Sequence, residues 1–130
     1  MRILGLTILI LVMLTAVGAQ TQAQYLTAVR PLPGYVCMRL NLPREQLLSP
    51  DLDVPIFNSP STSSPRLGKA AAALIVKSPM VVRDGLAEIL FLDGRVGWVA
   101  ASVLGPYATS SNPNARCTPS IMSNGRPGFG

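Results

Sequence analysis

The sequence predicts a small all-β domain, a single barrel of short strands, on three observations. Short segments rich in Val, Ile, Leu and Phe alternate at close spacing with turn-forming residues, a pattern typical of small barrels. The dipeptide Asp93-Gly94 separates two such segments and suits a tight hairpin turn. The chain has 130 residues, which is enough for one domain.

The first segment is expected to direct export and then to be removed. Arg2 supplies a positive start, and the apolar run over residues 3–17 is shorter than the about 20 residues of a membrane-spanning helix. Small residues fit cleavage after Ala19, and cleavage after Ala23 is a second candidate. An uncleaved anchor is the alternative. We expect a signal peptide over residues 1–19, no stable membrane span after cleavage, and a periplasmic or secreted protein.

Residues 20–53 are expected to form an irregular extension ahead of the barrel, with one strand. Residues 20–33 are polar and contain proline. Residues 35–42 alternate loosely between apolar and polar and favour a strand. Residues 43–48 favour one helical turn, because a proline near the start of a helix loses no hydrogen bond.

The barrel is expected to span residues 54–107. Residues 54–57 favour a short strand in which Pro55 lies at the start or on an edge, because proline donates no ladder hydrogen bond. Residues 58–66 have the composition of a loop. Within residues 67–77 the alanines favour a helix and the branched residues after them favour a strand; strand is our interpretation.

A hairpin is the best-defined element. Residues 88–92 and 95–99 are β-prone, and Asp93-Gly94 between them suits a type I′ turn, which needs positive φ at both residues. Residues 80–82 favour another short strand, and residues 100–103 favour a 3₁₀ turn. Gly97, inside the second strand, suggests a close approach of the backbone to a neighbour.

Residues 108–130 are expected to form a flexible tail. They are rich in Ser, Asn, Pro and Gly, a composition that buries little apolar surface. Cys117 lies within this tail, and Cys37 is the other cysteine of the chain.

The two cysteines are expected to form a disulfide. A cysteine pair in an oxidising compartment usually bridges. A metal pair or a reactive thiol is the alternative, although two cysteines without histidine fall short of the four ligands of a zinc site. A Cys37–Cys117 bridge would close a long loop and stabilise the fold by about 4 kcal/mol in the chain-entropy model.

Charge and composition argue against nucleic-acid binding and catalysis. The net charge is +5, but no two basic residues are adjacent, whereas a nucleic-acid footprint is clustered. The chain has no histidine, which excludes Ser–His–Asp and Cys–His arrangements. Asp51 and Asp53 could in principle do acid–base work, but two acids in a Pro-rich loop are usually solvated. We expect no enzyme activity, no cofactor, no metal and no nucleic-acid partner.

Three motifs in residues 54–107 resemble those of bacterial SH3 domains. They are PSTSSPRLG at residues 60–68, DGRVGWV at residues 93–99 and ASVLGPY at residues 101–107. The resemblance implies an SH3-like barrel and a binding function. Residues 85–88 depart from the family by lacking the tryptophan that many members carry there.

The resemblance does not extend to Pro-rich peptides. Eukaryotic relatives hold such peptides with a proline and a tyrosine in the 3₁₀ segment, and the aligned residues here are Ala100 and Val103. A polyproline helix needs aromatic walls, which these two residues do not supply.

The candidate ligand-binding residues are three aromatic and two basic side chains. Trp98, Tyr107 and Phe57 would form a platform, unless Trp98 packs on the barrel instead. Arg95 and Arg66 would pair with carboxylates of a ligand. The resemblance implies an exported binding module of the bacterial cell envelope that recognises peptidoglycan or an envelope protein. The alternative is a structural or accessory protein, or an inhibitor, without a small-molecule ligand.

Overall fold

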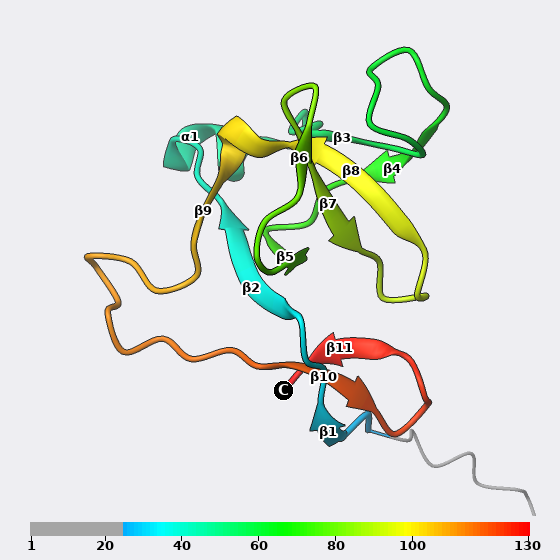
Figure 1. Cartoon of the computed structure of the whole chain (residues 1–130). Coiled ribbons are helices and arrows are strands. Elements are labelled where there is room, and N and C mark those ends of the chain that lie inside the picture. The colour runs from blue at the N-terminus through cyan, green and yellow to red at the C-terminus, as the bar shows by residue number, and fades with distance from the viewer. Residues whose placement is uncertain (1–24) are drawn as a thin grey trace, which may run out of the picture.

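The computed structural model describes residues 25–130, in which short strands form two sheets (Figure 1). The predicted all-β class is confirmed: the larger sheet curls into a barrel, and a smaller three-stranded sheet lies beneath it. The expected export leader, with its cleavage positions after Ala19 and Ala23, lies outside the described residues.

The larger sheet has the strand order β4-β3-β8-β7-β5-β2-β9, and β6 pairs with β7 outside this path. All its pairings are antiparallel. Its strands are β2 (Tyr35–Leu40), β3 (Pro55–Phe57), β4 (Arg66–Lys69), β5 (Ala73–Lys77), β6 (Val82–Arg83), β7 (Leu86–Leu90), β8 (Val96–Ala100) and β9 (Leu104–Pro106).

Most local predictions are confirmed. Pro55 is the first residue of β3, as its missing N–H requires. The helical turn is α1 (Arg44–Leu47), which begins after Pro43, and the 3₁₀ turn is η1 (Ala101–Val103), which leads into β9. The expected strand over residues 67–77 is divided into β4 and β5, because the chain bends between them.

The barrel begins earlier in the chain than residue 54, which corrects the predicted boundary. β2 lies between β5 and β9 inside the sheet, whereas the sequence assigned it to an extension. Its pairing with β5 runs from Tyr35 opposite Lys77 to Arg39 opposite Ala73. Leu40, at its end, is 1% exposed and belongs to the barrel core. A strand that contributes core side chains is a part of the barrel.

The tail contains regular structure, which corrects the prediction of a flexible segment over residues 108–130. Strands β10 (Pro119–Met122) and β11 (Pro127–Phe129) form a hairpin, and β1 (Ala28–Pro31) pairs with β10. β1 also corrects the expectation of an irregular start. Composition missed these strands because they are short and contain proline or glycine, so that strand pairing, rather than local propensity, determines them.

The barrel core consists of side chains from the inner face of the curled sheet. Gly97 lies on this face, where an added Cβ would come within 2.6 Å of Cγ2 of Ile56 and 2.7 Å of Cε2 of Phe91. The predicted close approach at Gly97 is confirmed. The buried core residues are Leu40, Val54, Ile56, Ala70, Leu74, Val76, Ile89 and Val99.

The two Asp-Gly dipeptides form different turns, and the predicted type I′ turn at Asp93-Gly94 is wrong. Gly94 has φ +88°, but Asp93 is not in the left-handed region. The amide of Gly94 donates to the carbonyl of Phe91 at 2.9 Å, and that of Phe91 donates to the carbonyl of Arg95 at 2.8 Å. These bonds define a three-residue loop that ends in a left-handed glycine.

The type I′ geometry occurs instead at the turn between β6 and β7. Asp84 and Gly85 have φ +49° and +77°, and Arg83 pairs with Leu86 directly across them. Asp93 avoids this conformation because its carboxylate accepts the amide of Arg95 at 2.9 Å, an Asx-type bond.

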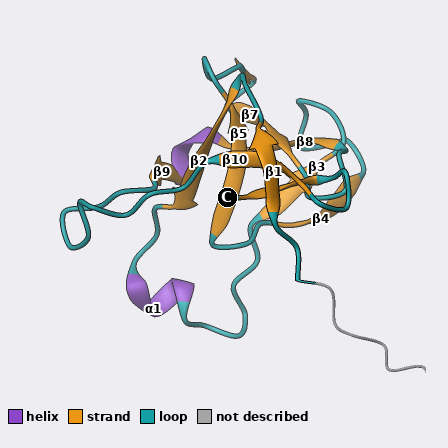
Figure 2. Cartoon of the chain, turned by 90° about the horizontal axis from the view of Figure 1, so that it is seen from below, coloured by secondary structure: helices purple, strands orange, loops and turns teal. Residues whose placement is uncertain are grey.

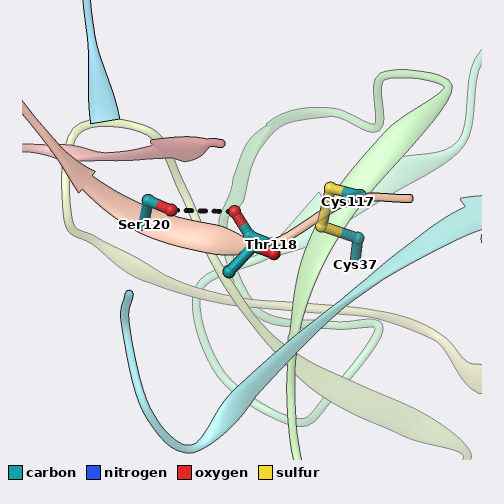
Figure 3. The surroundings of a disulfide bond; sticks show 4 residues. All are labelled: Cys37, Cys117, Thr118 and Ser120. Carbon is teal, nitrogen blue, oxygen red and sulfur yellow. Dashed lines mark hydrogen bonds between the residues drawn. A yellow bond between two sulfur atoms is a disulfide. The ribbon is translucent and has the colours of Figure 1, made fainter. Parts of the chain in front are cut away.

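A disulfide between Cys37 and Cys117 joins the barrel to the small sheet (Figure 3). The prediction of this bridge is confirmed; it links residues 80 apart in sequence, with 6.0 Å between the Cα atoms. Cys37 lies in β2, and Cys117 immediately precedes β10. Close to the bridge, the buried Ser120 hydroxyl donates to the carbonyl of Thr118 at 3.0 Å. The disulfide holds the small sheet against the barrel and fits an oxidising environment.

Candidate functional site

The structure brings four charged and aromatic side chains into one row on the outer face of the barrel. Trp98 of β8 lies opposite Phe57 of β3 on one side and Glu88 of β7 on the other. Phe57 in turn lies opposite Arg66 of β4. Directly opposed residues of neighbouring strands share a face of the sheet. We call Arg66, Phe57, Trp98 and Glu88 the outer row.

The row continues onto two further strands through charge interactions. Nζ of Lys77 lies 3.6 Å from Oε2 of Glu88 and 5.9 Å from the ring centroid of Tyr35. Lys77, the basic residue at this end of the surface, is therefore engaged with neighbours within the chain.

Trp98 presents little surface to a ligand. The residue is 7% exposed, although it lies on the outer face of the barrel. Phe57 is half-buried beside it, and neither residue lines any of the four cavities described for the chain. Such burial is typical of an aromatic side chain that packs on the barrel.

Tyr107, the third predicted aromatic residue, is not brought to the outer row by strand pairing. It follows β9, which pairs with β2, whereas Phe57 and Trp98 belong to the paired strands β3 and β8. The predicted platform therefore reduces to a pair of neighbouring rings, one of which is buried.

Both arginines predicted to meet a ligand carboxylate are paired within the chain. Arg66 binds both carboxylate oxygens of Asp53, with 2.9 Å between Nη1 and Oδ2. Nε of Arg95 donates to Oδ2 of Asp93 at 2.7 Å, and its guanidinium lies 5.1 Å from the ring centroid of Phe91. Bidentate and charge-assisted bonds of this kind reduce the attraction of either guanidinium for a ligand.

These pairs also hold the carboxylates in their charged form. Hydrogen bonds from the Arg66 side chain lower the pKa of Asp53 below its ordinary value, and the charges of Arg66 and Lys69 lower it further. A proton donor at neutral pH needs a raised pKa. Asp53, which lines a cleft beside α1 together with Asp51, is thus poorly suited to donate a proton.

Of the four hollows described, the most apolar lies where the barrel meets the small sheet. This hollow, the seam cavity, has a volume of about 370 Å³. Among the described residues that line it, Asp93 is the single charged one. The other lining residues include Ile56, Ala73, Ile75, Leu90, Phe91 and Phe129.

A second hollow continues the first along the small sheet. This seam groove, of about 450 Å³, shares Leu92, Asp93 and Phe129 with the seam cavity. Its other walls come from Leu26, which precedes β1, and from residues of β10, β11 and the turn between them, among them Arg126. The two hollows together form a concave, mainly apolar surface.

Large apolar side chains remain exposed at the rim of these hollows. Leu92, at the tip of the β7–β8 hairpin, is 52% exposed, and Phe129 is 36% exposed. Leu26 is also exposed on the groove side. In the view from below, β1 and β10 lie in front of the barrel strands, at the face where the small sheet packs (Figure 2). Clustered apolar exposure beside a hollow is typical of a binding site.

Charge is sparse at the rim. The main-chain amide of Arg95, followed by its guanidinium, lowers the pKa of the Asp93 carboxyl, and the charge of Arg126 contributes to the same shift. Arg126 lines the groove and is exposed. Its guanidinium forms no ion pair within 4 Å among residues 25–130.

The sequence did not point to Leu92, Phe129 and Arg126. Phe129 and Arg126 belong to the segment that was expected to be flexible, so the β10–β11 hairpin that carries them was not anticipated. Leu92 did carry a signal, because a leucine next to a hairpin turn has little reason to be apolar unless something covers it.

The part of the chain that the structure describes holds no group of three or more His, Cys, Asp or Glu residues able to bind a metal ion. No helix among the same residues is long and apolar enough to cross a membrane. Comparisons of the chain with protein-family models, with curated proteins and with solved structures find no match.

Proposed function

We propose that this chain is an exported, SH3-like binding module of the bacterial cell envelope, without enzyme activity, and that its partner is an envelope protein. The seam cavity carries the proposal: a concave, mainly apolar surface with exposed Leu92 and Phe129 at its rim. Ligand sites usually combine an apolar hollow with a few polar groups, and Asp93 and Arg126 supply such groups here.

The cellular setting rests on the disulfide and on the leader-like start of the sequence. The Cys37–Cys117 bridge is typical of proteins that work outside the reducing cytosol. The apolar run over residues 3–17, followed by small residues, supports a signal peptide. The module then acts in the periplasm or as a secreted protein.

A protein partner fits the site better than peptidoglycan. Stem peptides of the wall carry carboxylates, which Arg66 and Arg95 were expected to bind, and both are paired with Asp53 and Asp93. The apolar lining favours a side chain such as Leu, Val or Phe over a sugar or a charged stem peptide. Peptidoglycan binding is kept as an outcome of the test.

The test is a pull-down with two baits, purified cell-wall sacculi and solubilised envelope protein. Wild-type protein is expected to be retained by envelope protein and not by sacculi. Leu92→Asp, at the rim, should abolish retention. Leu48→Asp is the matched control, because Leu48 of the segment after α1 is 72% exposed and lines none of the described cavities.

Retention by sacculi alone would replace the protein partner with a wall ligand. Retention by neither bait would contradict the binding-module proposal and favour the structural or accessory reading. Circular dichroism of each variant shows that loss of retention reflects the surface and not unfolding.

A further inference from the structure

The outer edge of β11 leaves main-chain groups without a strand partner. Thr118 and Gly130 exchange two main-chain hydrogen bonds, of 3.3 and 2.7 Å, so they form a hydrogen-bonded pair. The next pair along the ladder, Pro119 opposite Phe129, is then a non-hydrogen-bonded pair. The N–H and C=O of Phe129 therefore point away from β10, and among residues 25–130 no strand pairs with β11 on that side.

This edge lies beside the hollows at the seam. The Phe129 side chain lines both the seam cavity and the seam groove. Leu92 and Asp93, at the tip of the β7–β8 hairpin, line both hollows as well. An unpaired strand edge next to an apolar hollow is the arrangement that binds an extended peptide, because main-chain bonds hold the peptide and the hollow takes one side chain.

β4 and β9, the two ends of the barrel sheet's strand order, are less suited to this role. β4, one edge of the barrel sheet, carries Arg66 and Lys69 at its ends, and charged residues protect an edge from pairing. β9, the opposite edge, has the same length as β11 and likewise contains a proline, so only its position separates the two edges. No residue of β4 or β9 lines the seam cavity or the seam groove.

Charge indicates what kind of peptide fits. Arg126 is exposed at the groove without an ion pair among the described residues, and the chain as a whole has a net charge of +5. An acidic side chain next to the bound apolar one would pair with Arg126. Complementary charge of this kind favours an acidic partner and steers its approach.

We propose that β11 binds an extended segment of the partner as an added strand, with an apolar side chain in the seam cavity and a neighbouring Asp or Glu on Arg126. This inference rests on the proposed function and names the chemistry of the partner: an acidic segment with an apolar anchor.

The proposal is tested by selecting a random heptapeptide library, displayed on phage, against the exported, disulfide-bonded protein. Selected peptides are expected to share an apolar residue within two positions of an Asp or Glu. Arg126→Glu should weaken the binding of a selected, fluorescein-labelled peptide about tenfold or more, the loss of a charge-assisted bond. Arg44→Glu, on exposed α1, is the matched charge reversal and should leave the affinity unchanged.

Hydrogen exchange reports the strand addition itself. The Phe129 amide should exchange at least about tenfold more slowly when the selected peptide is bound, because the added strand supplies its acceptor. A library that yields no binder, a peptide that binds Arg126→Glu as tightly as wild type, or an unchanged Phe129 exchange rate would each overturn the inference. If envelope protein still retains the chain in such a case, the proposed function stands and only the mode of binding is wrong.

Discussion

Asp93 accepts two hydrogen bonds from Arg95, one from the main-chain amide at 2.9 Å and one from Nε at 2.7 Å. This pair shapes the tip of the β7–β8 hairpin, where Asp93 and the adjacent Leu92 line both seam hollows. One local interaction therefore determines both the turn and one wall of the candidate site.

Low pH should weaken this hairpin tip and the Asp53–Arg66 pair. Both carboxyls have a pKa below the ordinary 3.8, because arginine groups favour their charged forms. A lowered folded-state pKa contributes stability above the ordinary value, and that contribution is lost as the pH falls through the folded-state value. We expect the urea midpoint to be flat from neutral pH to about pH 5 and to fall below about pH 4.

The double variant Asp53→Asn, Asp93→Asn identifies the source of this pH dependence. Its urea midpoint should vary less with pH below about 4 than that of the wild type, because the two shifted carboxyls are gone. An identical pH profile for the two proteins would contradict the assignment.

Gly94→Val should destabilise the fold by about 1–3 kcal/mol, since a β-branched residue is strained in the left-handed region that Gly94 occupies. Leu92→Val in the same loop is the control, because Leu92 does not have positive φ. Chemical denaturation measures both. Equal stability of the two variants would mean that residue 94 needs no left-handed conformation.

Trp98→Ala should lower the free energy of unfolding by about 3–5 kcal/mol, the usual cost of removing a large buried aromatic side chain. Trp98→Phe keeps most of the buried surface and should keep partner retention in the pull-down. A Trp98→Ala variant that folds with wild-type stability but is no longer retained would instead assign Trp98 to a binding platform.

The double variant Cys37→Ala, Cys117→Ala should be less stable by about 2–4 kcal/mol, because it removes the cross-link between barrel and small sheet. The amides of β10 and β11 should lose protection from hydrogen exchange first, since their remaining contacts with the barrel are few. Loss of protection that begins in the barrel core would contradict this role of the bridge.

Local sequence signals were enough to predict the barrel strands but not the small sheet. β3, β7, β8 and η1 are specified by apolar runs and by turn residues next to them. β1, β10 and β11 are short and have little strand propensity of their own. β10 and β11 form a local hairpin, whereas β1 joins it only by pairing with residues about 90 positions away, as for Ala28 and Met122.

The candidate site was predicted less well, for two physical reasons. A basic residue in the sequence says nothing about which carboxylate it will meet, and Arg66 and Arg95 both meet one of their own chain. The seam hollows need the small sheet as one wall, and Phe129 could not be placed before β11 was known. The disulfide, by contrast, was predicted from two cysteines and the expectation of an export leader alone.

Photo-crosslinking in living cells tests for a binding site at the seam, with p-benzoylphenylalanine in place of Leu92 or, as the matched control, of the exposed Leu48. We expect one defined protein adduct at position 92, lost when Arg126→Glu is added, and no such adduct at position 48. Absence of any adduct at position 92, or the same adducts at both positions, would contradict a binding site at the seam.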